Sequence, residues 1–396
     1  MSILNASVSG MLADSNWLSS ISQNVANANT TGYKNAETEF STLVNQISNG
    51  TSEGAGVRSR TISLNALQGN VVSSQTSTNL AVQGAGFFVV SDSSGALYLT
   101  RNGAFVQDAS GNLVNSAGYY LMASDVQGGQ SPTNSLSSLQ KVNIVSAGLT
   151  ASPTTSGSLA LNLPSTATPA SATASATTEQ TSLTTYDNLG GAHTLDIVFT
   201  KTGAQGDGQW QVQAFDGATA LGSPAALQFD TTTGKLQSGS PLTFTVPGGQ
   251  DAAIDLTNTT QLTAAFSVTS TTADGAAPGN LTGVSIAKDG TLSYTYSNGA
   301  SIKAYSIPLA NVESPTNLSS VNGGAYLANA ASGQIFLRSA SAGSFGAIES
   351  SALESSTVDL ATELTSMIEA QSAYQANSKV FQTGANILDV LNGLKA

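Results

Sequence analysis

Apolar side chains recur every seven residues at both ends of the chain. The repeat at the start comprises Leu4, Met11, Leu18 and Val25, with Val8 and Ile21 widening the same face. The repeat at the finish comprises Leu360, Met367, Tyr374, Phe381 and Leu388, with Leu364, Ile368 and Leu391 beside it. Such a spacing lines one side of a helix with apolar groups, and a sustained heptad favours packing against other helices. The pattern predicts helices over residues 3–27 and 357–396, each with a face that needs a partner.

Two kinds of partner are open for these helix faces. On the pattern alone, both helices fit on the body of the protein as ordinary amphipathic helices. The shared period and the β pattern of the body favour a second arrangement, in which the helices pair with each other as a coiled-coil-like stalk. In such a pair Tyr374 and Phe381 are expected in the core, whereas Trp17 covers the seam or faces a neighbouring subunit.

The segment after the first helix has a weaker pattern. Asn, Thr and Gly cluster at 27–32, where the helix is expected to end because Asn and Gly tolerate left-handed backbone angles. Four apolar residues then restore a short helical period, namely Phe40, Leu43, Val44 and Ile47. Residues 28–72 are predicted to be a connecting segment that orders only in context.

The body of the chain has the period of β-strands. Apolar runs at 87–90, 98–105, 113–114 and 119–122 are separated by turn-forming sequences such as SDSSG and DASGN. Residues 150–181 are rich in Pro, Ser, Thr and Ala, which predicts loops or a linker. Further strands are predicted from Leu195 to Val268 and again from Val284 to Ile307.

The order of these elements predicts a mainly β fold with terminal α-helices and nested β domains. If the helices of 1–27 and 357–396 pair as one assembly domain, residues 73–145 and 284–356 join as an inner β domain. Residues 146–283 then form an outer β domain inserted into the inner one. The layers are expected to follow one axis.

Composition narrows the classes of function. Only 9% of the 396 residues are charged, so the surface is easy to desolvate and suits burial against copies of itself. The net charge of −12 and the scattered basic residues argue against nucleic-acid binding, which needs a cationic footprint. The absence of Cys excludes disulfides and thiolate chemistry. No cleaved signal peptide and no membrane span are expected, because the start lacks a basic region and long apolar runs.

Candidate catalytic and metal-ligating residues are few. His193 is the single histidine and has no companion motif, so a surface turn is a better interpretation than a catalytic base. Asp92 and Asp108 have turn spacing and do not follow a calcium-loop pattern. Gly84 and Gly86 precede a strand, which favours a sharp bend over a phosphate cradle. No catalytic, cofactor or metal site is predicted, and the protein is not expected to be an enzyme.

Several segments carry a family resemblance. SQNVANANTTGYK at 22–34 is similar to the signature of bacterial flagellar rod and hook proteins, and its signature residues are Asn24, Asn27, Asn29, Thr30, Gly32, Tyr33 and Lys34. GAGFFVV at 84–90 and EAQSAYQANSKVFQTGANILDVL at 369–391 resemble the same family. The segments at 185–201 and 296–312 look like hook members, whose chains are generally longer than those of rod members.

Two departures from the family pattern stand out. Hook members commonly have Ser-Asn-Val-Asp-Leu before the last helix, and this chain has Thr357 at the second of these positions. Thr is an accepted helix cap, so no change of fold is expected. The segment ESPTNLSS at 313–320 lacks the family's Asn and Gly pattern, which leaves the contacts of that loop open.

The resemblance implies a structural subunit of the flagellar hook, a curved tube that acts as a universal joint and transmits torque from rod to filament. The terminal helices would pack radially into an open helical homopolymer. Implied partners are other copies, the distal rod, the hook cap, the hook–filament junction proteins and the flagellar type III export apparatus, with no cofactor. The location would be extracellular, in the flagellum. The alternatives are a secreted β-rich adhesin or passenger protein with helical oligomerising ends, and a rod protein.

Overall fold

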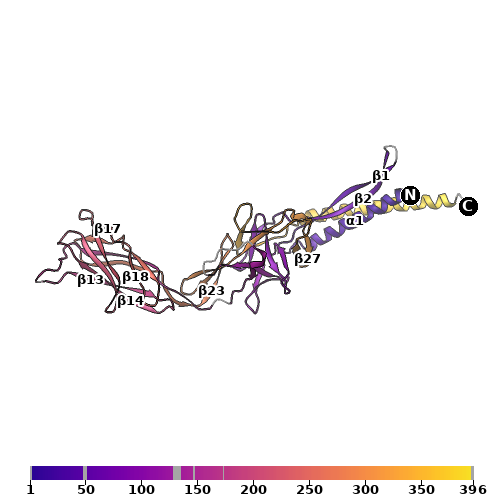
Figure 1. The fold of residues 1–396 in the computed structure, drawn as a ribbon. Coiled ribbons are helices and arrows are strands. Elements are labelled where there is room, and N and C mark those ends of the chain that lie inside the picture. Colours follow the sequence, from indigo (N-terminus) through magenta and orange to yellow (C-terminus); the bar gives the residue numbers. More distant parts are fainter. Residues whose placement is uncertain (1, 48–50, 128–134, 146–147, 173, 394–396) are drawn as a thin grey trace. The chain divides into compact units, whose positions relative to one another are not determined.

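The computed structural model describes residues 2–47, 51–127, 135–145, 148–172 and 174–393 (Figure 1). The chain forms two compact units. Unit 1 comprises Met1–Ser146, Val284–Tyr294 and Ile302–Ala396, and unit 2 comprises Ala147–Gly283 and Thr295–Ser301.

The two terminal helices of unit 1 lie side by side. Helix α1 spans Ser2–Ala26 and α2 spans Leu360–Gly393, and they run in opposite directions, with the start of α1 beside the end of α2 (Figure 1). The remaining elements are almost all strands. The predicted mainly β fold with paired terminal helices is confirmed.

The start of α2 differs from the sequence prediction. Asp359 caps the helix, because its Oδ1 accepts a hydrogen bond from the Ala361 amide at 2.9 Å. Thr357 was expected to cap the helix, and this is wrong. Its hydroxyl is instead engaged with Asn35, accepting from the Asn35 amide at 2.9 Å. The helix cap therefore lies two residues beyond Thr357, at Asp359, and Thr357 ties the preceding strand to the turn after α1.

A long hairpin occupies the segment after α1. Strand β1 (Ala36–Ile47) pairs antiparallel with β2 (Thr51–Ser63). The predicted short helical period over 40–47 is wrong, because β1 pairs with β2 along its length and this pairing overrides the spacing of its apolar residues. The hairpin rests on α1, where the rings of Trp17 and Phe40 meet edge to face with centroids 5.6 Å apart.

The β part of unit 1 is built around one large sheet, in which neighbouring strands such as β5 and β6 pair antiparallel. From β9 the order runs β9, β5, β6, β28, β27, and the core side chains include Phe87, Val89, Leu99 and Ala310. The predicted strands between 87 and 122 are confirmed, although the Asn-Gly pair at 102–103 divides the second run, 98–105, into β6 and β7. The other strands of unit 1 are β3 (Val71–Ser73), β4 (Leu80–Gln83), β5 (Phe87–Ser91), β6 (Leu97–Thr100), β7 (Phe105–Gln107), β8 (Leu113–Asn115), β9 (Tyr120–Asp125), β10 (Leu139–Lys141), β26 (Pro308–Asn311), β27 (Ser319–Val321), β28 (Ala325–Leu327), β29 (Phe336–Ser339), β30 (Ala347–Ser350) and β31 (Ala352–Glu354). Three further strands have residues in both units, namely β23 (Leu281–Ile286), β24 (Thr291–Tyr296) and β25 (Ser301–Ser306).

Unit 2 is a β domain with two five-stranded sheets. Its strands are β11 (Thr150–Ser152), β12 (Ser156–Pro164), β13 (Thr178–Tyr186), β14 (Ala192–Lys201), β15 (Gln209–Asp216), β16 (Thr219–Phe229), β17 (Leu236–Ser238), β18 (Leu242–Thr245), β19 (Asp251–Asp255), β20 (Thr260–Leu262), β21 (Ser267–Ala273) and β22 (Ala276–Gly279). The predicted linker over 150–181 is wrong, because β12 and the start of β13 fall within it. Leu159, Leu161 and Leu163 alternate into the core, a pattern hidden by the surrounding Ser, Thr and Ala.

Candidate self-assembly surface

The seam between α1 and α2 is made largely by small and polar side chains. Ala370 is fully buried, and Gly10 lies so close to α2 that a Cβ there would be 2.7 Å from Nδ2 of Asn377. The same Nδ2 donates to Asp14 Oδ2 at 2.8 Å. Nearer the end of α2, Gly384 leaves room for the side chain of Leu4. The helices approach closely because side chains at these positions are small or hydrogen-bonded.

The predicted apolar stripe of α1 lies partly in this seam. Ile21 is only 2% exposed, whereas Val8 and Leu12 are exposed. The other stripe residues are half-buried, namely Leu4, Met11, Leu18 and Val25. The α1 stripe is therefore mixed, with its best-buried member near the β part of unit 1.

The apolar stripe of α2 mostly points away from α1. Met367 and Leu388 are half-buried, and the side chain of Leu391 lies outside the described residues. The exposed apolar row of α2, our name for the large apolar side chains that solvent reaches, comprises Leu360, Leu364, Ile368, Tyr374, Val380, Phe381, Ile387 and Val390. The expectation that Tyr374 and Phe381 form the core of the pair is wrong, because smaller side chains already fill the seam.

Three members of this row escaped the heptad register. Val380, Ile387 and Val390 lie off the seven-residue positions, as does Leu12 on α1. Plotting every large apolar residue around the helix, instead of one register, would have found them. The seam residues Gly10, Asn377 and Gly384 gave no apolar signal in the sequence.

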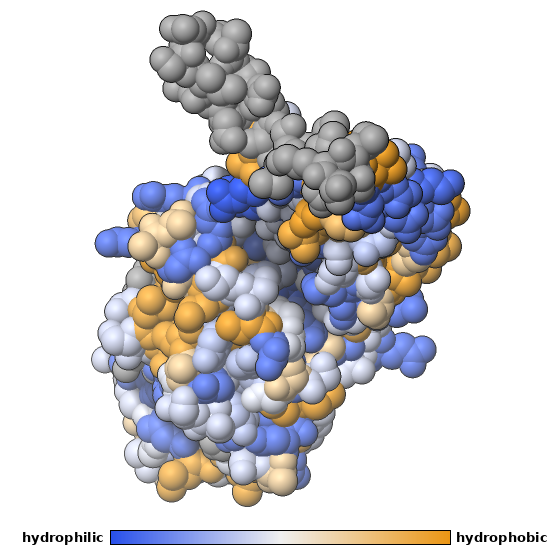
Figure 2. All heavy atoms as spheres, turned by 90° about the vertical axis from the view of Figure 1, so that its right-hand side faces the viewer, coloured by the Kyte–Doolittle hydropathy of each residue, from blue (hydrophilic) through white to orange (hydrophobic). Residues whose placement is uncertain are grey.

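Burial of the exposed apolar row of α2 in a complex would lower the free energy of that complex. Ile368 is 66% exposed and Leu364 is 51% exposed. Fully burying one such side chain stabilises a complex by about 1.5–3 kcal/mol relative to leaving it in water. Figure 2, viewed from the end where the helices lie in Figure 1, shows apolar side chains at the surface between hydrophilic ones. Leu360, Leu364 and Ile368 follow one another at single-turn spacing on α2, and contiguous exposed apolar surface is typical of interaction sites.

The turn after α1 is organised by Asn24. This side chain is 1% exposed, and its Oδ1 accepts from the Ala36 amide at 2.9 Å and from the Tyr33 hydroxyl at 3.2 Å. Its Nδ2 donates to the Ala36 carbonyl at 2.8 Å and to Glu363 Oε1 at 2.9 Å. One amide therefore joins α1, the start of β1 and the first turn of α2.

The other signature residues shape the same turn. Asn27 Nδ2 donates to the Gln23 carbonyl at 2.8 Å, and the Thr30 hydroxyl donates to Asn27 Oδ1 at 3.1 Å. Gly32 has φ of 69°, and a Cβ there would lie 2.6 Å from the backbone of Arg101, so only glycine fits. Asn29 is exposed.

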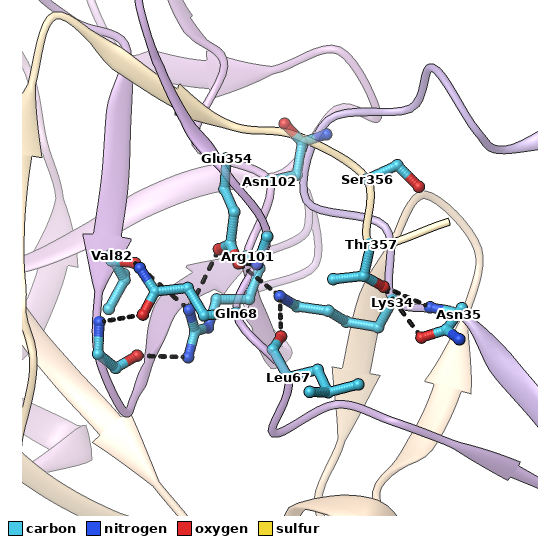
Figure 3. A network of polar contacts seen from close by, with 12 residues as sticks. Lys34, Asn35, Leu67, Gln68, Val82, Arg101, Asn102, Glu354, Ser356 and Thr357 are labelled. Carbon is cyan, nitrogen blue, oxygen red and sulfur yellow. Dashed lines mark hydrogen bonds and ion pairs between the residues drawn. The ribbon is translucent and has the colours of Figure 1, made fainter. Parts of the chain in front are cut away.

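Lys34 enters a buried charged cluster that we call the junction cluster, made of Lys34, Arg101 and Glu354 (Figure 3). Lys34 Nζ lies 2.5 Å from Glu354 Oε1 and also donates to the Leu67 carbonyl. Arg101 Nη1 lies 3.1 Å from Glu354 Oε2. The carboxylate of Glu354 accepts a further hydrogen bond from the Gly69 amide at 2.8 Å. The cluster joins the turn after α1, the large sheet and the strand that leads to α2.

The charges of the junction cluster are almost fully withdrawn from water. The side chains of Lys34 and Glu354 are 0% exposed and that of Arg101 is 2% exposed. Burial lowers the pKa of the Lys34 ammonium, and its hydrogen bond to Glu354 acts in the opposite direction. Glu354 is the single acid between two bases here, so the ion pairs depend on it.

Family models match four parts of the chain. "Flagella basal body rod protein" matches residues 4–34 and "Flagellar hook protein FlgE/F/G D1 domain" matches 81–171. "Flagellar basal body protein FlaE D2 domain" matches 160–276, and "Flagellar basal body rod FlgEFG protein C-terminal" matches 349–394. The first and last of these contain α1 with its turn and α2.

Three curated relatives align with almost the whole chain. The "Flagellar hook protein FlgE" of Rhizobium meliloti is 41% identical over 409 residues, covering 99% of this chain and 98% of the relative. The protein of the same name from Brucella suis is 40% identical over 399 residues, with coverage of 99% and 98%. The one from Escherichia coli is 32% identical over 417 residues, with coverage of 98% for both. The chain belongs to the flagellar hook protein family. The resemblance carried by the turn at 22–34 is thereby confirmed.

Within this hook-family chain, Glu363 is a titratable group at the helix seam. It accepts from Asn24 in the first turn of α2. Burial raises the pKa of Glu363 above its ordinary value, the Asn24 hydrogen bond opposes this rise, and the nearby Glu37 charge adds to it. A carboxyl whose pKa is raised on folding contributes stability below its unfolded pKa and loses it as the pH rises through the folded value.

We expect Glu363→Gln to reveal this dependence. Relative to wild type, the variant should gain stability as the pH rises from about 4 to about 7, by less than about 1 kcal/mol because water screens a half-exposed group. Gln retains an oxygen that can accept from Asn24. Urea midpoints of both proteins at the two pH values check this, with Glu369→Gln on the exposed side of α2 as a charge-matched control. A difference between wild type and Glu363→Gln that stays constant with pH contradicts the expectation.

The other residues considered as catalytic or metal-ligating candidates take part in local contacts of turns and strands. His193 lies near the start of β14, with its Nε2 3.6 Å from Asp187 Oδ2 and its Nδ1 3.6 Å from Asp216 Oδ2. Asp92 and Asp108 accept backbone amides of their own turns. Among the described residues, no cluster of His, Asp and Glu could hold a metal ion. None of the helices in the described ranges is long and apolar enough to cross a membrane.

Proposed function

We propose that this chain is the structural subunit of the bacterial flagellar hook and polymerises helically into a curved tube that transmits torque from rod to filament. The observation that carries the proposal is the exposed apolar row of α2, in a chain that belongs to the hook family. A lone subunit leaves this row in water. Assembly removes it from water against other copies.

The predicted assembly residues take specific roles in this proposal. The exposed apolar row of α2, together with Val8 and Leu12 of α1, packs against helices of neighbouring copies. Ile21 and the small residues of the seam hold the pair together within one subunit. A head-to-tail contact of this kind, repeated through a rotation that does not close, produces an open helical polymer. The low charged fraction of 9% keeps the cost of desolvation small.

The junction cluster has a mechanical role in the proposal. Torque applied to the β layers must reach the helical wall through the chain segments at 27–36 and 354–360. Asn24 and the junction cluster fix both segments to unit 1 through hydrogen bonds and ion pairs. We propose that residues 73–145 with 284–356 form the layer next to the helical wall, and that residues 146–283 form the outer layer.

Partners and location follow from the same proposal. The chain contacts other copies along the tube, the distal rod at one end and the hook cap or hook–filament junction proteins at the other. It reaches the outside of the cell through the flagellar type III export apparatus, without cleavage. It performs no enzymatic step.

Electron microscopy of the purified chain tests the function. We expect concentrated protein to form open-ended, curved tubes in negative stain, whereas an adhesin with oligomerising ends forms closed particles of fixed size. A rod subunit forms short straight assemblies. Closed trimers as the end product would contradict the proposal. The rod alternative is not favoured, since the relatives of similar length reported above all carry the hook name.

A further inference from the structure

Asparagine followed by glycine is a dipeptide whose side-chain amide is prone to loss of ammonia. In this chain it occurs at 49–50, 102–103, 298–299, 322–323 and 392–393. Glycine has no Cβ, so its backbone nitrogen can approach the amide carbon of the preceding side chain. The structure describes the side chains of three of these asparagines, Asn102, Asn298 and Asn322. Their surroundings differ in a way that predicts different reactivity.

Two of the three asparagines are held in place. Asn298 Nδ2 donates to the Thr150 carbonyl at 3.1 Å and to the Ala277 carbonyl at 2.7 Å, and its Oδ1 accepts from the Ala300 amide at 3.0 Å. Asn102 is buried, and its Oδ1 accepts from the Ala104 amide at 3.2 Å. Either side chain must give up these bonds before it can react.

Asn322 is in the opposite situation. It is exposed at the turn between β27 and β28, and its side chain forms no hydrogen bond with any residue that the structure describes. Its backbone is anchored, because the Asn322 carbonyl accepts from the Tyr119 hydroxyl at 3.0 Å. Gly323 and Gly324 follow, with φ of 81° and 71°. The side-chain amide of Asn322 is free to rotate. The attacking backbone nitrogen belongs to Gly323, which has no side chain to block its approach.

We propose that Asn322 is a site of spontaneous deamidation. The backbone nitrogen of Gly323 attacks Cγ of Asn322, a C–N bond forms, the Cγ–Nδ2 bond breaks, and ammonia leaves with the proton of the Gly323 amide. Water then opens the resulting five-membered imide at either carbonyl carbon. The product is aspartate or isoaspartate, and no oxidant, cofactor or enzyme is consumed.

The modification changes the end of the large sheet in unit 1. It adds one carboxylate to a chain of net charge −12. In the isoaspartate form, the main chain also passes through the former side chain and is longer by one carbon. Among the strands that the structure describes, β27 pairs with β28 alone, so the altered turn lies at the edge of the sheet. The inference rests on this turn alone and does not require polymerisation.

Peptide mass spectrometry of the full-length chain tests the proposal. The folded protein is incubated in mildly alkaline buffer, sampled over time and digested with trypsin, which places Asn322 in peptide 304–338, Asn298 in 289–303 and Asn102 in 102–141. We expect Asn322 to deamidate at least roughly tenfold faster than Asn298, since the three side-chain hydrogen bonds of Asn298 must first be broken. In denaturant, where these bonds are absent, the rates at 298 and 322 should converge.

Asn322→Gln is the matched control, because a longer side chain disfavours the five-membered ring while keeping the amide. It should eliminate the deamidated form of peptide 304–338, and persistence of that form would assign the reaction to another asparagine of the peptide. Deamidation of native Asn298 at the same rate as Asn322, or faster, would overturn the proposal. The proposal would also be overturned if Asn322 deamidated at one rate in folded and denatured protein and that rate were as slow as the rate of Asn298 in the folded protein.

Discussion

Glu354→Gln should lower the free energy of unfolding of unit 1 by about 3–5 kcal/mol, because it leaves two buried cations without their shared anion. Lys34 and Arg101 are each within 3.1 Å of this carboxylate, and all three side chains are removed from water. Glutamine supplies one neutral oxygen in place of two charged ones. It cannot satisfy Lys34, Arg101 and the Gly69 amide together.

Hydrogen exchange measures this loss within unit 1. The amides of β5, whose side chains are all buried, should exchange more than about 100-fold faster in Glu354→Gln than in wild type. Glu349→Gln is the matched control, because Glu349 pairs at 2.8 Å with Lys288, whose side chain is 73% exposed. A surface pair contributes only about 0–1 kcal/mol. If the β5 amides exchange at the same rate in both variants, the junction cluster does not stabilise unit 1 as we describe.

Leu364→Asp should abolish polymerisation and leave the β parts folded. Leu364 is 51% exposed, so a carboxylate there stays hydrated in the free subunit. In the polymer the same carboxylate would have to enter an apolar contact. Losing about 1.5–3 kcal/mol of apolar burial and adding a desolvated charge should raise the critical concentration at least roughly 100-fold. Sedimentation across a concentration series gives this value.

Thr365→Asp is the charge-matched control for Leu364→Asp. Thr365 is the neighbouring exposed residue on α2 and is not part of the apolar row. We expect its critical concentration to stay far closer to that of wild type. Ile21→Asp is a poorer probe than Leu364→Asp, because Ile21 is 2% exposed and its replacement would disturb the helix pair itself. Normal polymers from Leu364→Asp would refute the assignment of the row.

The sequence predicted the two helices well because a heptad repeat is a local signal. It failed on β1, where apolar residues at helical spacing are held in a strand by pairing with β2, and pairing partners cannot be read from one segment. It failed on β12 for a different reason. Three leucines in alternation were diluted by the Ser, Thr and Ala residues around them.

The candidate site was predictable only in part. The signature residues Asn24, Gly32 and Lys34 were found by resemblance, but their roles depend on Glu354, Glu363 and Arg101, which lie far away in the sequence. The direction of the α2 stripe was not predictable from its period. Which face meets α1 is decided by close contacts such as the one between Gly10 and Asn377, and a repeat of large apolar residues does not reveal the small ones that form a seam.

The central claim is that the exposed apolar row of α2 becomes the contact between copies in an open tube. A cryo-electron microscopy reconstruction of tubes grown from this chain tests it most directly, because it shows side-chain surroundings in the polymer. The account predicts that Leu364 and Ile368 are buried against helices of neighbouring copies, with the α1–α2 seam of each subunit kept as described. A tube in which Leu364 and Ile368 face solvent, while its contacts are made elsewhere, would contradict the account.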